Sequence, residues 1–367
     1  MNMKKTTKYI CTLIAAAAFI LLLVFLESNK NTYGMAVTVL QKGFILAVVA
    51  VSMNLLNGFT GLFSLGQAGF MALGAYTYAI FTIPLESRAS VYYISGMNPV
   101  LAGIELPMLA ALLAGGLVAA LFAAVIGFPV LRLKSDYLAI ATLGFSEIIR
   151  ALIASPQMDT VTNGSYGLKS IPAASIYVVI GLCIVCIGIM ALLINSSYGR
   201  AFKAIREDEI AAEAMGINLL KHKELAFVIS SFFAGIGGGL LAMFMRSIDS
   251  STFKIALTYD ILLIVVIGGM GSITGSVLSA LLVTASKEWW LRFFDEPLTI
   301  GGVSIPLFRN GFRMVIFSVL LMVVVLFYRR GIMGTNEFSW EGLFGLIRSV
   351  PQRIGSLFRR KEGASNE

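Results

Sequence analysis

The sequence predicts an all-α polytopic membrane protein with about ten transmembrane helices and with both termini in the cytoplasm. Hydrophobic residues make up 57% of the 367 positions and charged residues only 13%, whereas a soluble domain carries about a quarter charged residues. A soluble fold of this length has no core large enough to bury that much apolar surface. Lipid is therefore the solvent for most of the chain. No long stretch alternates with the period of a strand, so we do not expect an outer-membrane barrel.

A membrane-spanning helix needs about 20 apolar residues, and runs of this kind recur along the whole chain. We expect ten spans at residues 9–26, 35–56, 67–83, 107–131, 137–154, 175–194, 225–245, twice within 259–286, and at 310–328. The first span resembles a signal peptide. Because its apolar run is long and residues 27–31 form a poor cleavage site, we expect an uncleaved anchor.

The stretch 259–286 is divided into two spans because of its glycines. Gly268, Gly269, Gly271 and Gly275 fall within eight residues, and each glycine inside a helix costs about 1 kcal/mol relative to alanine. We therefore expect two helices joined by a tight turn.

The distribution of lysine and arginine gives the expected orientation. With a cytoplasmic N-terminus, the cytoplasmic segments carry about twice as many basic residues as the opposite side, as the positive-inside rule requires. These segments are the N-terminal lysines, Arg132 with Lys134, residues 195–223, and the tail from Arg329. The formal net charge of +8 comes from these short segments. No basic patch with interleaved aromatic residues is present, so nucleic-acid binding is not expected.

We divide the chain into an anchor with a short external loop (1–34), a transmembrane domain (35–328) and a basic cytoplasmic tail (329–367). Cys183 and Cys186 form a C-x-x-C pattern inside an apolar run. Small apolar side chains are a simpler interpretation of this pair than redox or metal chemistry. His222 is the only histidine, so we expect neither a histidine-based metal site nor a Ser/His/Asp triad.

Residues 195–223, hereafter the coupling segment, form the one long charged stretch between spans. Asn195 and Ser197 are candidate N-caps, and Gly216 is placed to end a helix. We expect two short amphipathic helices joined near residues 207–209, with Ala201, Phe202 and Ile205 on one apolar face. That face would dock on the bilayer surface or in a groove of a partner protein. The acidic residues argue against an anionic-lipid role alone. A solvated loop is the remaining alternative.

The run YGRAFKAIREDEIAAEAMGIN (198–218) resembles the coupling loop of ABC importer permeases, specifically of the LivM-type branched-chain amino acid family. Three other stretches match that family in order: NLLNGFTGLFSLGQAGFMALGAY (54–76), YLAIATLG (137–144) with TNGSYGL (162–168) downstream, and GGMGSITG (268–275). Together they cover roughly residues 35–328. Four ordered matches are far more specific than one glycine-rich motif.

The resemblance implies a coupling helix that sits in a cleft of an ATP-hydrolysing subunit. The coupling residues would be Arg206, Glu207, Asp208, Glu209, Ala211, Ala212, Glu213 and Gly216. The broader importer pattern is Glu-Ala-Ala, three residues, then Gly. Here Ile210 replaces the leading Glu, with Glu209 and Glu213 nearby. Which carboxylate meets the ATPase is open.

The resemblance also implies partners. The chain has no Gly-Lys pair and hence no phosphate-binding loop of the G-x-x-x-x-G-K-[ST] type. We expect no enzyme activity and no bound cofactor, with ATP used by two ATP-binding cassette subunits. A second homologous permease and a periplasmic or lipid-anchored solute-binding protein complete the assembly in the bacterial inner membrane.

The solute is the open part of this interpretation. Branched-chain amino acids are the default, and urea or short amides are the runner-up, because relatives carry them and the motifs do not separate the cases. An ion-coupled secondary transporter is a second class, with Glu147 as its mid-membrane acid, but it leaves the coupling segment unexplained. Candidates for the translocation path are Asn54, Gly58, Gly61, Gln67, Thr142, Ser146 and Glu147.

Each of these candidates has a structural alternative. The glycines from Gly58 to Gly74 mark either unwound backbone beside a cavity or close helix packing. Thr142 and Ser146 could bond only their own backbone. Glu147 and Arg150, three residues apart, form either a structural pair or part of the pathway. Asp260 is expected to be an interfacial cap.

Overall fold

The structure is a computed structural model that describes residues 5–94, 96–133 and 135–290 together with short pieces of the remainder, at 299–300, 303–304, 315–316, 318–319, 322, 331–334 and 336–337. These are the described residues below. Helices dominate them, and two short strands, β1 (Thr299–Ile300) and β2 (Val303–Ser304), pair antiparallel. Most of the expected span 310–328 and of the tail 329–367 lies outside the described residues.

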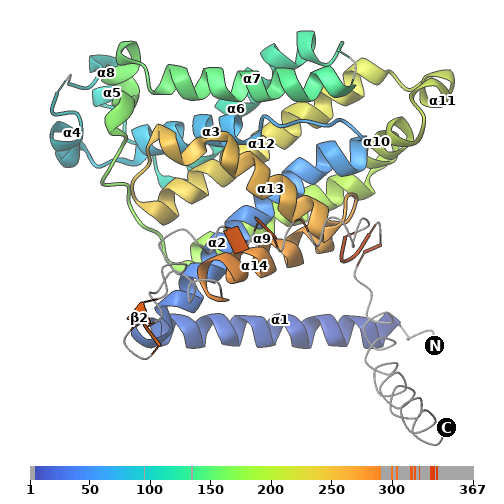
Figure 1. The fold of residues 1–367 in the computed structure, drawn as a ribbon, viewed down its shortest axis with the longest axis horizontal. Coiled ribbons are helices and arrows are strands. Elements are labelled where there is room, and N and C mark those ends of the chain that lie inside the picture. Colours follow the sequence, from blue (N-terminus) through green and yellow to red (C-terminus); the bar gives the residue numbers. More distant parts are fainter. Residues whose placement is uncertain are drawn as a thin grey trace, which may run out of the picture.

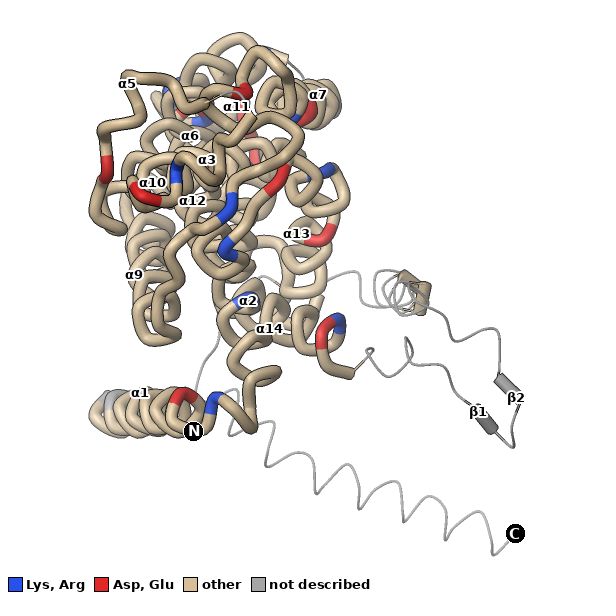
Figure 2. Tube along the Cα trace, turned by 90° about the vertical axis from the view of Figure 1, so that its left-hand side faces the viewer, with Lys and Arg blue, Asp and Glu red and all other residues tan. Residues whose placement is uncertain are grey.

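The long helices coincide with the expected spans. In chain order the helical elements are α1 (Lys5–Ser28), α2 (Lys30–Asn54), the π-helix η1 (Leu55–Thr60), α3 (Gln67–Thr82), α4 (Leu85–Val91), α5 (Pro99–Ala102), α6 (Met108–Val130), α7 (Ser135–Ile153), η2 (Pro156–Met158), α8 (Asp159–Thr162), η3 (Gly164–Tyr166), α9 (Ile176–Asn195), α10 (Ser197–Glu207), α11 (Glu209–Ala214), α12 (Leu219–Met245), η4 (Ser250–Phe253), α13 (Ile255–Gly268) and α14 (Ile273–Glu288). Figure 2 shows the tube tan along most of its helical length, with few charged positions.

Five helices among the described residues are long and apolar enough to cross a membrane, and two bent pairs raise the number to seven. The bends are 119° between α3 and α4 and 60° between α7 and the η2–α8 region. The expected division of 259–286 into two helices is confirmed, since α13 and α14 flank the glycine turn. At roughly 21 and 24 Å these helices are shorter than the ~30 Å hydrocarbon core. Ten spans and cytoplasmic termini stay predictions.

α12 begins at Leu219, six residues before the expected span start at 225. The reason is a polar first turn that apolar content alone does not mark. The Asn218 side chain caps this turn by accepting a hydrogen bond from the backbone N–H of Lys221 at 3.0 Å.

The connecting segments gather at two opposite ends of the bundle (Figure 1). At one end, the backbone N–H of Asn98 donates to Thr160 O at 3.0 Å and Leu168 pairs with Ile248. This end also holds α4, α5 and α8, and the other end holds α10 and α11 (Figure 1). The division matches a chain that crosses back and forth, with α10 and α11 on the side we expect to be cytoplasmic.

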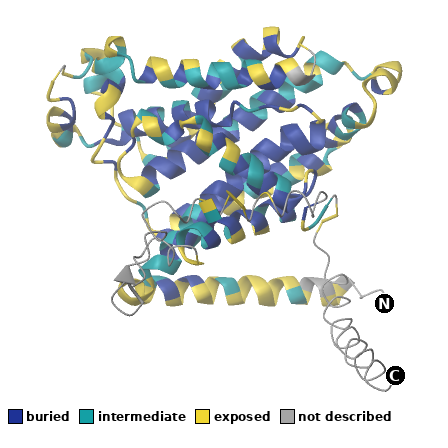
Figure 3. Cartoon of the chain, in the orientation of Figure 1, coloured by how far each residue is buried: buried dark blue, intermediate teal, exposed yellow. Residues whose placement is uncertain are grey.

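Glycines bring α3, α6 and α12 into backbone contact at the centre of the bundle. A Cβ added at Gly74 of α3 would lie 2.0 Å from the carbonyl oxygen of Gly235 in α12. One added at Gly238 would lie 2.0 Å from Met71 O, and one at Gly115 of α6 would lie 2.8 Å from Gly74 O. Small residues of this kind allow membrane helices to pack closely. Figure 3 shows this region as the buried centre of the molecule.

α1 lies at the edge of the bundle and is mostly exposed (Figure 3). Only 11% of residues 10–28 are buried, although the helix is rich in side chains such as Leu13 and Leu21, which are exposed. Such a surface suits lipid as the surrounding solvent. This arrangement fits the anchor expected from the sequence.

We expect Gly74→Ala to destabilise the protein, because its methyl group has no space against the α12 backbone. Overpacking of this kind costs about 1–3 kcal/mol, occasionally more. The matched control is Gly188→Ala on the exposed surface of α9, where an added Cβ meets nothing within 4 Å. Thermal unfolding in detergent, followed by circular dichroism, should show a lowered midpoint for the first variant only. Equal midpoints would contradict the backbone contact.

Candidate functional site

The side chain of Asn54 joins the end of α2 to the glycine turn at 268–275. Asn54 is fully buried. Its Nδ2 donates to Ser272 O at 2.9 Å and to Ser276 Oγ at 2.8 Å, and its Oδ1 accepts from the backbone N–H of Gly271 at 2.9 Å. One amide therefore satisfies polar groups of two segments that are far apart in the sequence.

Gly58 lies against the same contact. A Cβ at this position would lie 1.8 Å from Asn54 Oδ1 and 2.4 Å from the nitrogen of Gly271, so the site excludes any side chain. The surrounding backbone is the π-helix η1, which ends at Gly61 with φ 76° in the left-handed region. Here the glycine serves close approach of two backbones, the packing alternative.

Arg206 brings the coupling segment to this junction. Its Nη1 donates to the carbonyl oxygen of Gly58 at 2.8 Å, and its guanidinium also pairs with Glu207. A Cβ at Gly61 would lie 3.0 Å from Arg206 Cγ, and one at Gly271 would lie 3.1 Å from Arg206 Nη1. Three of the sequence motifs thus meet within a few ångströms. We name the group Asn54, Gly58, Arg206 and Gly271 the junction.

α10 packs its apolar face on the chain's own membrane domain. Phe202 is fully buried and Ile205 nearly so, with the Phe202 ring centroid 6.5 Å from that of His222. Lys203 Nζ lies 5.6 Å from the centroid of the Phe59 ring of η1. The expectation that this face docks on the bilayer or on a partner is therefore wrong for α10, because the domain itself supplies the groove.

The ends of α10 and α11 follow local rules. α10 has Ser196 as its N-cap residue, without a side-chain capping bond, so Asn195 and Ser197 do not cap it as expected. Asp208 caps α11, and its Oδ1 accepts from the N–H groups of Ile210 and Ala211 at 2.9 and 3.1 Å. Gly216, at φ 86°, ends α11 as predicted, with its N–H bonded to Glu213 O at 2.9 Å.

α11 presents a different face from α10. Ile210 is 82% exposed and Met215 is 83% exposed, although both are large and apolar. Of the predicted coupling residues, Glu207, Asp208, Glu209, Ala211, Glu213 and Gly216 are exposed, Arg206 is half-buried and Ala212 is buried. Glu209 is held by Lys223 at 2.6 Å. The exposed tip of the coupling segment is therefore α11.

The remaining path candidates lie between α3, α7 and α12, apart from the junction. Gln67 is buried and donates to Ser230 Oγ at 2.9 Å. Thr142 Oγ1 accepts from the backbone N–H of Leu65 at 3.0 Å and donates to Ala139 O, and buried Ser146 packs against Gly69. The hydroxyl of Thr142 thus fixes a neighbouring segment as well as bonding its own helix.

The Glu147–Arg150 pair forms as the spacing predicts. Arg150 Nη2 lies 2.6 Å from Glu147 Oε2, and each side chain is 28% exposed. The geometry is that of an i, i+3 pair on one face of α7.

Glu337 is a site residue that sequence reasoning assigned to the tail. Its carboxylate accepts from the backbone N–H groups of Ile273 and Thr274 at 2.8 and 3.1 Å and from Thr274 Oγ1 at 2.7 Å. It thereby caps the N-terminus of α14. Glu337 also lines a cavity of about 400 Å³ with Lys203 and Arg206. The only sequence signal was the pair Gly331 and Gly334, which lets the backbone approach the turn.

Among the described residues no group of His, Cys, Asp and Glu has the arrangement of a metal site. Cys183 and Cys186 are free thiols of α9.

Over residues 35–337 the sequence matches the family described as the permease component of branched-chain amino acid transport systems. The chain is 32% identical over 298 residues to the high-affinity branched-chain amino acid transport system permease protein LivM of Escherichia coli, and equally to that of Salmonella typhimurium. Each alignment covers 71% of this chain and 65% of the relative, so the chain spans about 65% of their length.

More distant relatives carry different names. A probable branched-chain amino acid transport permease protein LivM of Methanocaldococcus jannaschii is 24% identical over 313 residues, 77% of this chain and 88% of that protein. The guanosine ABC transporter permease protein NupQ of Bacillus subtilis is 26% identical over 277 residues, 68% of this chain and 77% of that protein. No solved structure matches the chain.

We expect Asn54→Ala to loosen the glycine turn, because the buried N–H of Gly271 loses its acceptor. An unsatisfied buried donor costs about 1–3 kcal/mol. Hydrogen exchange of residues 268–275, read by mass spectrometry, should be about tenfold faster or more. The control is Asn29→Ala, whose exposed side chain makes a local bond to Phe25 O. Unchanged exchange in the first variant would show that the junction does not depend on Asn54.

Proposed function

We propose that this chain, which belongs to the family of branched-chain amino acid transport system permease components, forms one transmembrane subunit of an importer that separate ATP-hydrolysing subunits drive. The importer lies in the bacterial inner membrane. The observation that carries the proposal is the contrast between α10, which is packed on the domain, and α11, which is capped at both ends and exposes Ile210 and Met215.

The proposed coupling follows from this contrast. An exposed apolar pair on a short, capped helix is suited to a groove on a partner protein. The partner here is an ATP-binding cassette subunit, and closure of two such subunits moves their grooves. α10 carries the displacement inward because Arg206 is bonded to Gly58 O at 2.8 Å. Asn54 passes it on to the turn between α13 and α14 through its bond to Gly271.

The opposite end of the bundle is the proposed docking face of a solute-binding protein. The rings of Tyr93 and Tyr166 meet there with centroids 6.3 Å apart, and both are exposed. Tyrosine is enriched where protein surfaces meet. With Asn163 and Lys169 they line a cavity of about 220 Å³. A second, homologous permease subunit would complete the path for the solute.

We propose branched-chain amino acids as the solute, with urea or short amides as the runner-up. Support comes from the relatives that bear the LivM name. The guanosine permease among the relatives indicates that family membership alone does not fix the solute. Uptake of labelled leucine, isoleucine and valine, with urea and acetamide as competitors, tests the choice. Competition by urea but not by isoleucine would favour the runner-up.

Energy coupling separates the proposal from an ion-coupled transporter. Glu147, the acid that such a transporter would use, is held by Arg150 at 2.6 Å. We therefore expect uptake to stop when cellular ATP is depleted with the proton gradient maintained. We expect uptake to persist when an uncoupler collapses the gradient while ATP is maintained. The reverse pattern would contradict an ATP-driven importer.

The double variant Ile210→Asp with Met215→Asp should abolish co-purification with the ATPase subunits, because charges replace the exposed apolar pair. The matched control is Val100→Asp, which is also exposed but lies on α5 at the opposite end of the bundle. Solubilised complexes can be captured through a tag on the permease and the ATPase quantified by immunoblotting. A complex that survives the double variant intact would contradict the assignment of α11.

A further inference from the structure

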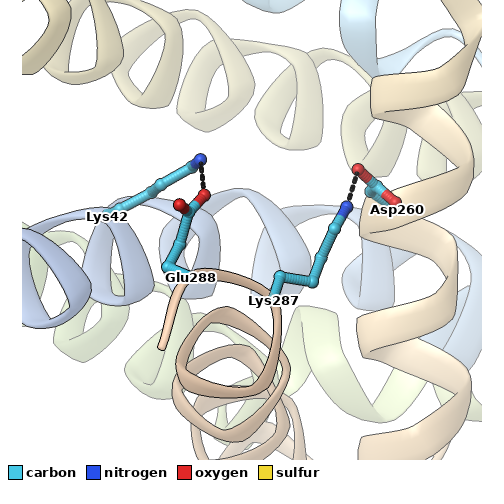
Figure 4. A network of polar contacts seen from close by, with 4 residues as sticks. All are labelled: Lys42, Asp260, Lys287 and Glu288. Atoms are coloured by element: carbon cyan, nitrogen blue, oxygen red, sulfur yellow. Dashed lines mark hydrogen bonds and ion pairs between the residues drawn. The ribbon is translucent and has the colours of Figure 1, made fainter. Parts of the chain in front are cut away.

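Two ion pairs lie side by side between α2, α13 and α14, far from the coupling segment (Figure 4). Lys42 of α2 pairs with Glu288 of α14 at 2.5 Å, and Lys287 of α14 pairs with Asp260 of α13 at 2.7 Å. Asp260 lies six residues into α13, so it does not cap the helix as expected from the sequence. The four groups carry no net charge together.

The depth of these pairs is unusual. Lys42 lies twelve residues from either end of α2, which corresponds to roughly 18 Å in each direction. α2 with η1 is one of the helices able to cross the membrane, so the pairs lie near the middle of a span. Ionisable groups at such depth are costly, and they face water or another protein surface rather than lipid. Between 27% and 39% of each side chain is exposed, so this face requires such a surrounding.

A cavity of about 210 Å³ opens beside the four groups. Its walls include the aliphatic side chains of Leu46, Leu241, Ile264 and Val283. Thr284 also lines it, is only 2% exposed, and its Oγ1 has no hydrogen-bond partner among the described residues. A buried hydroxyl without a partner is rare in a finished core. It indicates a polar ligand that the cavity receives.

We propose that this cavity is a binding site for the zwitterionic head and aliphatic side chain of an amino acid on its way through the membrane. The inference rests on the proposed function, since it assigns the solute class a place within that transporter. The solute carboxylate would bind Lys42 or Lys287, its ammonium group Asp260 or Glu288, and its side chain the aliphatic wall.

The balance of charge favours a zwitterion over other small solutes. Two lysines and two carboxylates that already neutralise each other can exchange partners with a zwitterion without leaving any charge unpaired. A singly charged solute would leave one group uncompensated. Urea carries no charge and would leave both pairs as they are. The volume lies below the roughly 300–1,000 Å³ of drug-sized sites, which suits a solute of few atoms.

The first test uses proteoliposomes that contain the complete importer and its binding protein. Asp260→Asn and Lys42→Met should each lower the transport of labelled L-leucine about tenfold to a hundredfold, with co-purification of the ATPase subunits unchanged. Glu27→Gln is the matched control, since Glu27 pairs with Lys30 at the exposed start of α2. Transport within twofold of wild type in both variants would overturn the site.

A merely structural role of the ion pair is tested by the exchange variant Asp260→Lys with Lys287→Asp. It keeps a pair of opposite charges but moves each charge to the other helix. Recovery of wild-type transport would show that only the pair matters, and would overturn a direct contact with the solute. Continued loss, with the importer still assembled, is the expected result.

Binding can be measured without the binding protein, whose own selectivity would otherwise dominate. Millimolar L-leucine should raise the melting temperature of the purified permease–ATPase complex, whereas 4-methylpentanoate and 3-methylbutylamine, which lack one of the two charges, should not. No shift with L-leucine, or equal shifts with all three, would overturn the site. A wild-type importer that carries no L-leucine would instead contradict the proposed solute.

Discussion

The buried amide of Asn54 is the contact on which the rest of the arrangement depends. Backbone groups inside a bilayer must be satisfied by the protein itself, and two glycine-rich turns at one end of the bundle break the helices that would otherwise satisfy them. Asn54 supplies both a donor and an acceptor at this place, reaching Ser272 and Gly271. Because the turn is held in this way, Gly58 can offer its carbonyl oxygen to Arg206, and the coupling segment has a fixed point on the membrane domain.

Local sequence rules predicted much of the structure. The division into α13 and α14 followed from the cost of glycines in a helix, and the break between α10 and α11 lies at Asp208 because its carboxylate caps the second helix. The Glu147–Arg150 pair followed from helical spacing. All these features depend on residues within a few positions of one another, so that propensity and spacing contain the required information.

Long-range pairing could not be predicted in the same way. The partners of Asn54, Arg206 and Lys42 lie 217, 148 and 246 residues away in the sequence, and nothing in a single sequence sets those pairs apart from other combinations. The apolar face of α10 shows the same limit, because its periodicity indicates burial but not the surface that covers it. Glu337 caps α14 from a segment whose composition indicated only a basic tail.

The glycine contacts at the centre of the bundle have a mechanical consequence. Where α3, α6 and α12 touch through backbone atoms, at Gly74, Gly115 and Gly235, there are no side chains to change rotamer, and sliding would bring backbone atoms into collision. These three helices therefore form a stator. The contacts of α13 and α14 run through long side chains such as Lys42 and Lys287, which can re-form at a new spacing. The hairpin of α13 and α14 is the part of this subunit free to act as the rotor.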